Sequence, residues 1–172
     1  VNKTTIDELV YILDSLKDGI SDETDTLKPL FETEEDRIEF RNRHYRTKVK
    51  KRDLNTYQGK AFLGVDVGST TSKAVLVDED GSVLYTFYSS NEGNPIEVVR
   101  KILKEIYEIL PKGVEVVHAG STGYGEALIK SAFKMDVSEV ETISHFTAAK
   151  YFKDDVSFIL DIGGQDMKAI KI

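Results

Sequence analysis

Two short stretches of the sequence carry residue types suited to phosphate chemistry, and they share one pattern. Residues 63–77 read LGVDVGSTTSKAVLV, and residues 160–172 read LDIGGQDMKAIKI. When the second stretch is shifted onto the first by 95 positions, four residue types coincide, in the pairs Asp66 and Asp161, Gly68 and Gly163, Lys73 and Lys168, and Ala74 and Ala169. The pattern apolar–Asp–x–Gly–polar–Lys–Ala–apolar therefore occurs twice.

Each stretch is typical of a β-hairpin whose tip binds an anion. A glycine at the tip lets the backbone approach a ligand closely, and successive N–H groups of such a turn form a concavity that commonly holds phosphate. Lys73 would place a point charge on the β- or γ-phosphate of a nucleotide. Four hydroxyl side chains add hydrogen-bond donors after Gly68, namely Ser69, Thr70, Thr71 and Ser72.

The two aspartates call for a cation, because a carboxylate alone repels phosphate whereas Mg²⁺ can lie between the two. Asp66 and Asp161 are therefore the predicted metal ligands and catalytic carboxylates, one on each side of a nucleoside triphosphate. A simpler alternative is that both aspartates only end strands in similar turns, but it leaves the repeated Lys-Ala-apolar segment unexplained. Other phosphate motifs are missing: no G-x-x-x-x-G-K-[ST] occurs, and GSTGYG lacks the dinucleotide G-x-G-x-x-G spacing.

The elements expected around these hairpins alternate strands with helices. Three meandering strands and then helix–strand–helix–strand–helix predict an α/β domain with a mixed sheet, helices on its faces, and the fourth strand parallel to the first. This is the ribonuclease-H-like arrangement. The predicted strands cover 61–67, 72–78, 82–90, 113–119 and about 140–143, the helices cover 95–110, 124–133 and 144–152, and a hairpin covers 158–172.

The first 60 residues differ from the rest in composition. Residues 1–40 carry 12 acidic and 4 basic side chains, and residues 41–60 carry 1 acidic and 8 basic side chains. An amphipathic helix is predicted at 5–18, where Thr5 and Glu8 can form a capping box. A second helix, capped by Thr33 and with a thin apolar face, is predicted at 33–46. The basic run is interpreted as a solvated linker rather than a nucleic-acid site, because no aromatic-rich sheet or groove-reading motif accompanies it.

Composition also bounds the class of protein. The chain has 172 residues and no cysteine, and 31% of its residues are charged, so we expect a cytoplasmic protein without disulfides or a membrane segment. The first residue is Val and the last lies in a strand-like run, which predicts a fragment of a larger, two-lobed protein. The predicted domains are a helical extension at 1–60, a first lobe at 61–154, and the opening hairpin of a second lobe at 155–172.

The sequence resembles the BadF/BadG/BcrA/BcrD ATPase family, which includes activators of 2-hydroxyacyl-CoA dehydratases and ATPase subunits of benzoyl-CoA reductases. The resemblance covers residues 61–172, where four motifs agree in order and spacing: GVDVGSTTSKAVLVD, STGYGEALI, VETISHFTAAKYF and ILDIGGQDMKAIKI. The paired hairpins look like the two phosphate elements of the actin, hexokinase and heat-shock-chaperone ATPase superfamily. Residues 1–60 look like the connector before the second ATPase unit of tandem family members.

The resemblance implies an actin-like ATPase that binds ATP and Mg²⁺ between two lobes. In the full-length protein it implies a homodimer or tandem unit with a [4Fe–4S] cluster, and single-electron transfer to a CoA-thioester dehydratase or reductase, driven by ATP hydrolysis. The cluster's cysteines are expected beyond residue 172, and this fragment is expected to be nearly inactive alone. The implied phosphate residues are Asp66, Gly68, Ser69, Thr70 and Lys73 in the first element, and Asp161, Gly163, Gly164 and Gln165 in the second.

Several other polar residues are candidates for roles near this site. His145, four residues after Glu141, could orient the attacking water or accept its proton; capping or packing is an equal alternative. Tyr124 could face the cleft, although a turn in which Ser121 or Thr122 caps the next helix is the favoured interpretation. His118 and His44 are interpreted as structural and solvated, respectively.

Two other functions stay open at this point. A small-molecule kinase of the same superfamily, for sugars or carboxylic acids, would need an inserted acceptor loop with a catalytic aspartate, and no such insertion separates the two hairpins. A non-catalytic interaction module would instead use the N-terminal helices to dock a partner. The resemblance favours the ATPase activator over both.

Overall fold

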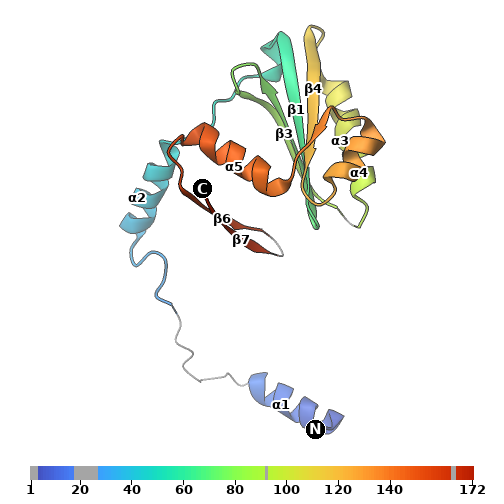
Figure 1. Ribbon diagram of the computed structural model, residues 1–172. Coiled ribbons are helices and arrows are strands. Elements are labelled where there is room, and N and C mark those ends of the chain that lie inside the picture. Colours follow the sequence, from blue (N-terminus) through green and yellow to red (C-terminus); the bar gives the residue numbers. More distant parts are fainter. Residues whose placement is uncertain (1–3, 18–26, 92, 164–165) are drawn as a thin grey trace. The chain divides into compact units, whose positions relative to one another are not determined.

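The computed structural model describes residues 4–17, 27–91, 93–163 and 166–172 of the chain. It divides into two compact units, Val1–Lys48 and Val49–Ile172. The first unit holds two helices and the second holds the sheet with the remaining helices (Figure 1).

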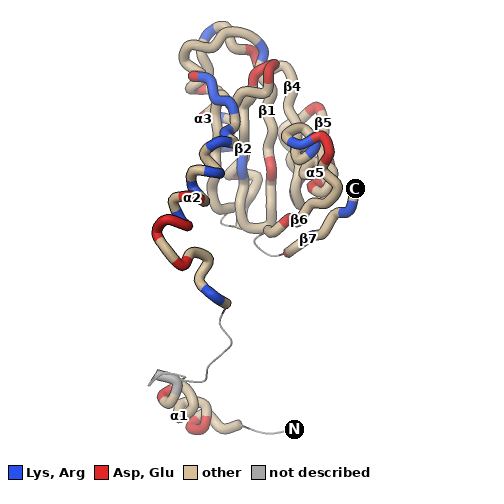
Figure 2. Tube along the Cα trace, turned by 90° about the vertical axis from the view of Figure 1, so that its left-hand side faces the viewer, with Lys and Arg blue, Asp and Glu red and all other residues tan. Residues whose placement is uncertain are grey.

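Both helices of the first unit begin with a reciprocal cap. Helix α1 spans Ile6–Lys17, and before it the Thr5 N–H donates to Glu8 Oε2 at 2.8 Å while the Glu8 N–H donates to Thr5 Oγ1 at 3.3 Å. Helix α2 spans Glu34–Tyr45 and is capped by Thr33 in the same way. Acidic residues lie in the first turn of α2 and basic ones in its last (Figure 2), which suits the helix dipole.

The second unit is built on a five-stranded mixed sheet in the order β3-β2-β1-β4-β5, with a separate β6–β7 hairpin. Strand β1 pairs antiparallel with β2 and parallel with β4, as predicted. Figure 1 shows α3 and α4 on one face of the sheet and α5 with the hairpin on the other. The elements are η1 Leu54–Thr56, β1 Gly59–Val67, β2 Thr71–Asp78, β3 Val83–Ser90, α3 Pro95–Ile109, β4 Val114–Thr122, α4 Glu126–Phe133, β5 Val137–Ser138, α5 Glu141–Phe152, β6 Phe158–Ile162 and β7 Met167–Lys171.

The short strand predicted at 140–143 is wrong. The carbonyl of Val140 accepts hydrogen bonds from the Ile143 and Ser144 N–H groups at 3.0 Å, so these residues begin α5. The short strand is β5, which lies earlier in the chain and pairs parallel with the end of β4. The β-branched residues of this segment favour a strand, but such a preference is weak, and here the helical hydrogen bonds override it.

The core lies between the sheet and helices α3 and α4. Residues alternate in β1, so that Ala61, Leu63, Val65 and Val67 are buried, and α3 buries Val99, Ile102 and Ile106 at helical spacing. Successive strand residues point to opposite faces of the sheet. The residues between the buried ones, including Asp66, therefore point away from this core.

The β2–β3 turn is fixed by a buried carboxylate, Asp78, which is only 2% exposed. Its Oδ1 accepts from the Asp80 N–H at 2.9 Å and the Ser82 N–H at 2.8 Å, and its Oδ2 lies 3.0 Å from Arg52 Nη1. The segment around Arg52 also joins the sheet, since the Val83 N–H donates to Lys50 O and the Arg52 N–H donates to Val83 O.

We expect Asp78→Ala to lower the free energy of unfolding by about 2–3 kcal/mol, because two turn N–H groups lose their acceptor and Arg52 loses its ion pair. Urea denaturation followed by circular dichroism would measure this. Asp80→Ala is the matched control, since the Asp80 side chain is 75% exposed in the same turn, and we expect it to cost less than about 0.5 kcal/mol. Equal losses in the two variants would contradict the role of Asp78.

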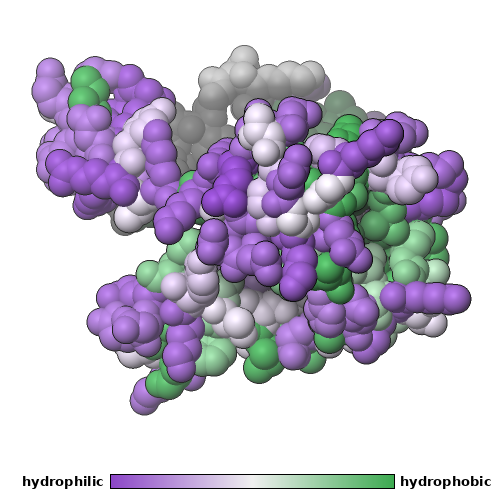
Figure 3. Space-filling view, turned by 90° about the horizontal axis from the view of Figure 1, so that it is seen from above, coloured by the Kyte–Doolittle hydropathy of each residue, from purple (hydrophilic) through white to green (hydrophobic). Residues whose placement is uncertain are grey.

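The surface seen in Figure 3 is largely hydrophilic, with smaller apolar patches between the polar side chains. Among the helices that the structure describes, none combines the length and the apolar character of a bilayer-spanning segment.

Candidate active site

The first predicted phosphate turn joins β1 to β2 at residues 68–71. The Gly68 N–H donates to Thr71 O at 2.9 Å and closes the turn, and Ser69 and Thr70 are exposed at its tip. Directly below the turn, Asp66 and Lys73 face each other across the strands, with Lys73 Nζ 2.8 Å from Asp66 Oδ2. The structure thus brings the first set of predicted residues together at one end of the hairpin.

The second hairpin repeats this geometry. Asp161 lies opposite Lys168 in the β6–β7 register, and the Gly163 N–H donates to Asp166 O at 2.9 Å. Both features fall 95 positions after their counterparts in the first hairpin, so the repeated sequence produces a repeated register and a repeated closing bond. Two further predicted residues, Gly164 and Gln165, lie outside the described residues.

Asp66 has one carboxylate oxygen without a protein partner. Its Oδ1 is buried and accepts no hydrogen bond from any described residue, while Oδ2 pairs with Lys73. The carboxylate also lines a cavity of about 360 Å³, together with Lys73, Thr122, Glu139 and Ser144. Burying a carboxylate oxygen without a hydrogen-bond partner costs folding free energy. The position therefore suits a cation or an ordered water beside Asp66.

A glycine that the sequence analysis treated only as part of a turn packs against this carboxylate. A Cβ on Gly123 would lie 2.6 Å from Asp66 Oδ1 and 2.5 Å from Val67 O, and the residue has φ +87°. A glycine-rich segment between a strand and a helix was the available signal, but the sequence does not indicate which carboxylate it approaches.

Asp161 is held differently from Asp66. His145 Nδ1 lies 3.0 Å from Asp161 Oδ2, whereas Lys168 Nζ is 4.0 Å from that oxygen. Since a carboxylate accepts, Nδ1 donates; in the tautomer that carries its one ring proton on Nδ1, Nε2 is an acceptor. The structure therefore joins two predicted catalytic residues, His145 and Asp161, in a histidine–aspartate pair.

Lys168 is drawn toward α5 and the second turn. Its Nζ lies 2.8 Å from Glu141 Oε2 and 3.0 Å from Asp166 Oδ2. The hydrogen bonds to Glu141 and then to Asp166 raise the pKa of Lys168, so the side chain stays charged at neutral pH. Glu141 thus ties the start of α5 to the second hairpin.

Among the described residues, no group of three or more His, Cys, Asp and Glu side chains is arranged to hold a metal ion. Mg²⁺ nevertheless needs only one or two carboxylates when waters and phosphate oxygens complete its shell. A magnesium site shared by the two aspartates therefore stays a prediction.

The remaining candidates have local roles. Ser121 and Thr122 do not cap α4, as the favoured interpretation held: the N-cap is Gly125, without a side-chain cap, and the two hydroxyls donate to Glu126 O and Glu139 O at 2.8 Å. That interpretation is wrong because β4 extends through Thr122, so both hydroxyls belong to the strand. Tyr124 is 70% exposed, and its hydroxyl lies 3.5 Å from Asp166 Oδ2.

The two other histidines have partners close to them in the chain or in the fold. His118 Nδ1 lies 3.5 Å from Asp136 Oδ2, which agrees with a structural role. His44 is exposed on α2, as predicted, and its Nδ1 is 2.7 Å from Phe40 O.

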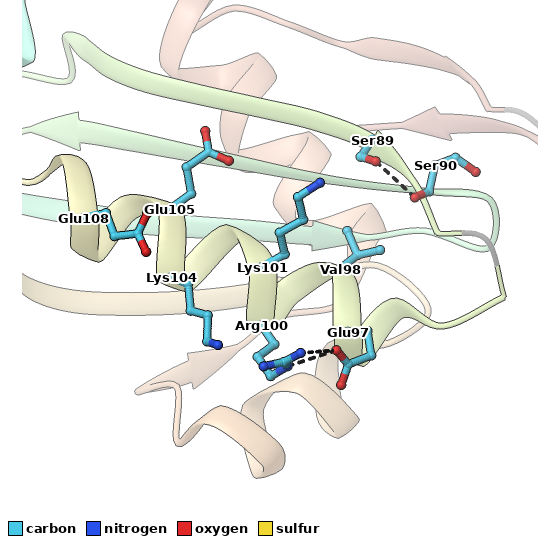
Figure 4. A pocket seen from close by; sticks show the side chains of 9 residues that line it. All are labelled: Ser89, Ser90, Glu97, Val98, Arg100, Lys101, Lys104, Glu105 and Glu108. Atoms are coloured by element: carbon cyan, nitrogen blue, oxygen red, sulfur yellow. Dashed lines mark hydrogen bonds and ion pairs between the residues drawn. The ribbon is translucent and has the colours of Figure 1, made fainter.

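A larger hollow, of about 570 Å³, lies between the end of β3 and α3 (Figure 4). Its lining carries both signs of charge, and Arg100 is already paired with Glu97 at 2.6 Å. Its charged residues lie on a helix surface, and none of the predicted site residues lines it. The cavity beside Asp66 is therefore the better candidate site.

The fold and the paired hairpins define the class: the second unit has the fold of an actin-like ATPase. The crystal structure of the Acidaminococcus fermentans (R)-2-hydroxyglutaryl-CoA dehydratase component A superposes with a TM-score of 0.54 at 25% identity, covering 66% of this chain and 43% of that one. The Clostridium difficile activator of 2-hydroxyisocaproyl-CoA dehydratase, with bound ADPNP, gives 0.52 at 25% identity, covering 65% and 41%.

The chain belongs to the BadF/BadG/BcrA/BcrD ATPase family, whose sequence model matches residues 63–172. An uncharacterized protein of Methanocaldococcus jannaschii is 36% identical over 111 residues, which are 64% of this chain and 43% of the relative. The activator of lactoyl-CoA dehydratase from Anaerotignum propionicum is 32% identical over 111 residues, covering 64% and 41%. The chain thus spans less than half the length of these relatives. The predicted family is confirmed.

Proposed function

We propose that these 172 residues form part of an ATPase that activates a CoA-thioester dehydratase, or a partner like benzoyl-CoA reductase. The carrying observation is the pair of hairpins with the same Asp–Lys register and the same glycine closing bond. Relatives that activate 2-hydroxyacyl-CoA dehydratases support the kind of partner. Within the proposal, residues 1–60 are an extension, 61–154 the first lobe and 155–172 the opening hairpin of the second.

The proposed site holds a nucleoside triphosphate at the two turns. Ser69, Thr70 and Thr71 donate from amides and hydroxyls to the β- and γ-phosphates, and Lys73, already at the base of the turn, neutralises their charge. Gly163, Gly164 and Gln165 form the opposing turn in this proposal. The likeness to an activator with bound ADPNP supports a nucleotide as the ligand.

The residues present fit a magnesium ion beside the first turn. Asp66 offers a buried oxygen without a hydrogen bond and lines an open cavity. When bound, Mg²⁺ would neutralise charge on the transferring phosphoryl group. In the proposal Asp66 holds the ion or its waters, Asp161 acts from the second hairpin, and His145 orients the attacking water through Nε2.

For the whole protein, the proposal couples ATP hydrolysis to single-electron transfer to a cytoplasmic partner, with a homodimer or tandem ATPase as the assembly. The residues of this chain do not fit the [4Fe–4S] cluster that such transfer uses, because cysteine thiolates ligate these clusters and this chain has none. No electron-transfer step is therefore derived for these residues.

Calorimetric titration of the chain tests the proposal. We expect Mg·ATP to bind with a Kd on the order of 0.1 mM, and Mg·AMP at least about tenfold more weakly, because AMP lacks the phosphates that the turns contact. Chelating the magnesium with EDTA should weaken ATP binding as well. Equal affinity for ATP and AMP, or no binding of either, would contradict a phosphate-binding role for these hairpins.

A further inference from the structure

The first phosphate turn is hydrogen-bonded to Asn91, a residue that the sequence pattern did not single out. Asn91, at the end of β3, is only 3% exposed. Its side-chain Nδ2 donates to Gly68 O at 2.7 Å, its Oδ1 accepts from Ser72 Oγ at 2.6 Å, and its backbone N–H donates to Thr70 O at 2.9 Å. One asparagine therefore contacts the first residue of the turn, its third residue and the strand that follows it.

The orientation of this amide follows from its partners. A backbone carbonyl can only accept, so the group that faces Gly68 O must be the NH₂ of Asn91, and Oδ1 is left to face the Ser72 hydroxyl. Ser72 is itself fully buried. The interaction cannot be reproduced by a carboxylate, which would set two acceptors against each other at Gly68 O.

These contacts determine where the amides of the turn point. In a trans peptide the C=O and the following N–H are antiparallel. Holding the Gly68 and Thr70 carbonyls toward Asn91 therefore directs the Ser69 and Thr71 N–H groups to the opposite side. Among the described residues, no bond runs from the Thr71 N–H to Gly68 O, so this N–H is not used to close the hairpin.

We propose that Asn91 is a positioning residue that keeps the backbone N–H groups of the first phosphate turn turned outward, ready for the phosphates of a nucleoside triphosphate. The inference rests on the proposed function for its ligand, but the geometry of the turn is independent of it. Asn91 touches no phosphate in this proposal and acts through the carbonyls of Gly68 and Thr70.

The test compares Asn91→Asp with Asn94→Asp in the whole chain. Asn94 undergoes the same chemical change three residues away. Its side chain caps α3 by accepting from the Glu97 N–H, and aspartate is an equally good cap. We expect Asn91→Asp to raise the Kd for Mg·ATP about tenfold and leave that for Mg·AMP nearly unchanged, and Asn94→Asp to change neither. A variant that was merely less stable would lose both affinities in proportion.

A second variant covers the case in which Asn91→Asp does not fold. Ser72→Ala removes the hydroxyl that fixes Asn91 Oδ1 but leaves the donor to Gly68 O, so we expect a loss of Mg·ATP affinity of about threefold. Unchanged preference for ATP over AMP in both variants would overturn the inference.

Amide hydrogen exchange separates this inference from the proposed function. Without any nucleotide, Asn91→Asp should speed exchange of the Gly68 amide and of the residue 91 amide, and Asn94→Asp should not. If the unmodified chain fails to prefer ATP, the proposed function fails while exchange still tests the role of Asn91. If the chain prefers ATP but exchange at these amides is the same in both variants, the positioning role is wrong.

Discussion

Replacing Asp66 with asparagine should raise the Kd for Mg·ATP about 100-fold, the upper end of the loss of metal affinity seen when a residue that supports a metal ion's ligands is changed. Asparagine keeps the shape of the side chain and can still accept from Lys73, but it cannot hold a divalent cation by charge. The fold should survive, because the pair with Lys73 is partly exposed and such pairs contribute little to stability. Calorimetric titration measures the affinity.

The magnesium dependence of ATP binding shows whether the loss of affinity in Asp66→Asn comes from the loss of the metal ion. In the unmodified chain EDTA should weaken ATP binding, whereas in Asp66→Asn it should have almost no further effect, because the metal contribution is already lost. Asp80→Asn is the matched control: the same change on an exposed aspartate at the β2–β3 turn, where both affinity and magnesium dependence should be unchanged. A variant at Asp66 that kept full magnesium dependence would show that this carboxylate does not hold the ion.

Local patterns predicted most of this fold. Alternating apolar residues located β1 and β2, and helical spacing located α3, because each has one face in the core. The equal spacing of Asp66 to Lys73 and of Asp161 to Lys168 predicted two hairpins, and a shared spacing in sequence became a shared register across the strands.

The parts that could not be predicted depend on contacts between distant segments. Lys168 matches Lys73 in sequence, yet its Nζ contacts Glu141 at the start of α5, whereas the Nζ of Lys73 contacts Asp66 of its own hairpin. Asn91 looked like an ordinary loop residue, since its partners lie about 20 positions earlier in the chain. The prediction of a strand near Val140 was wrong for a related reason. The position of β5 depends on its pairing with the edge of β4 rather than on local strand propensity.

Gly123→Ala should be the most destabilising of these substitutions, lowering the free energy of unfolding by about 3–4 kcal/mol. Two effects add. A φ of +87° strains any residue with a Cβ. The new methyl group would also overlap Val67 O, at 2.5 Å, and Asp66 Oδ1, at 2.6 Å, and overpacking of this kind costs about 1–3 kcal/mol. Val67 O cannot move away freely, because it already accepts from the Gly125 N–H at 3.1 Å.

Gly93→Ala separates the two effects, since Gly93 also has positive φ, at +76°, but a Cβ there would meet nothing within 4 Å. Urea denaturation should therefore show a loss of about 1 kcal/mol at Gly93, from backbone strain alone, and roughly three times that at Gly123. The methyl group at position 123 would also displace the Asp66 carboxylate, so any folded Gly123→Ala protein should bind Mg·ATP more weakly. Gly93→Ala should bind Mg·ATP with unchanged affinity. Equal losses of stability in the two variants would mean that β4 and α4 move apart to accommodate the methyl group. The close contact between Gly123 and Asp66 would then not constrain the carboxylate.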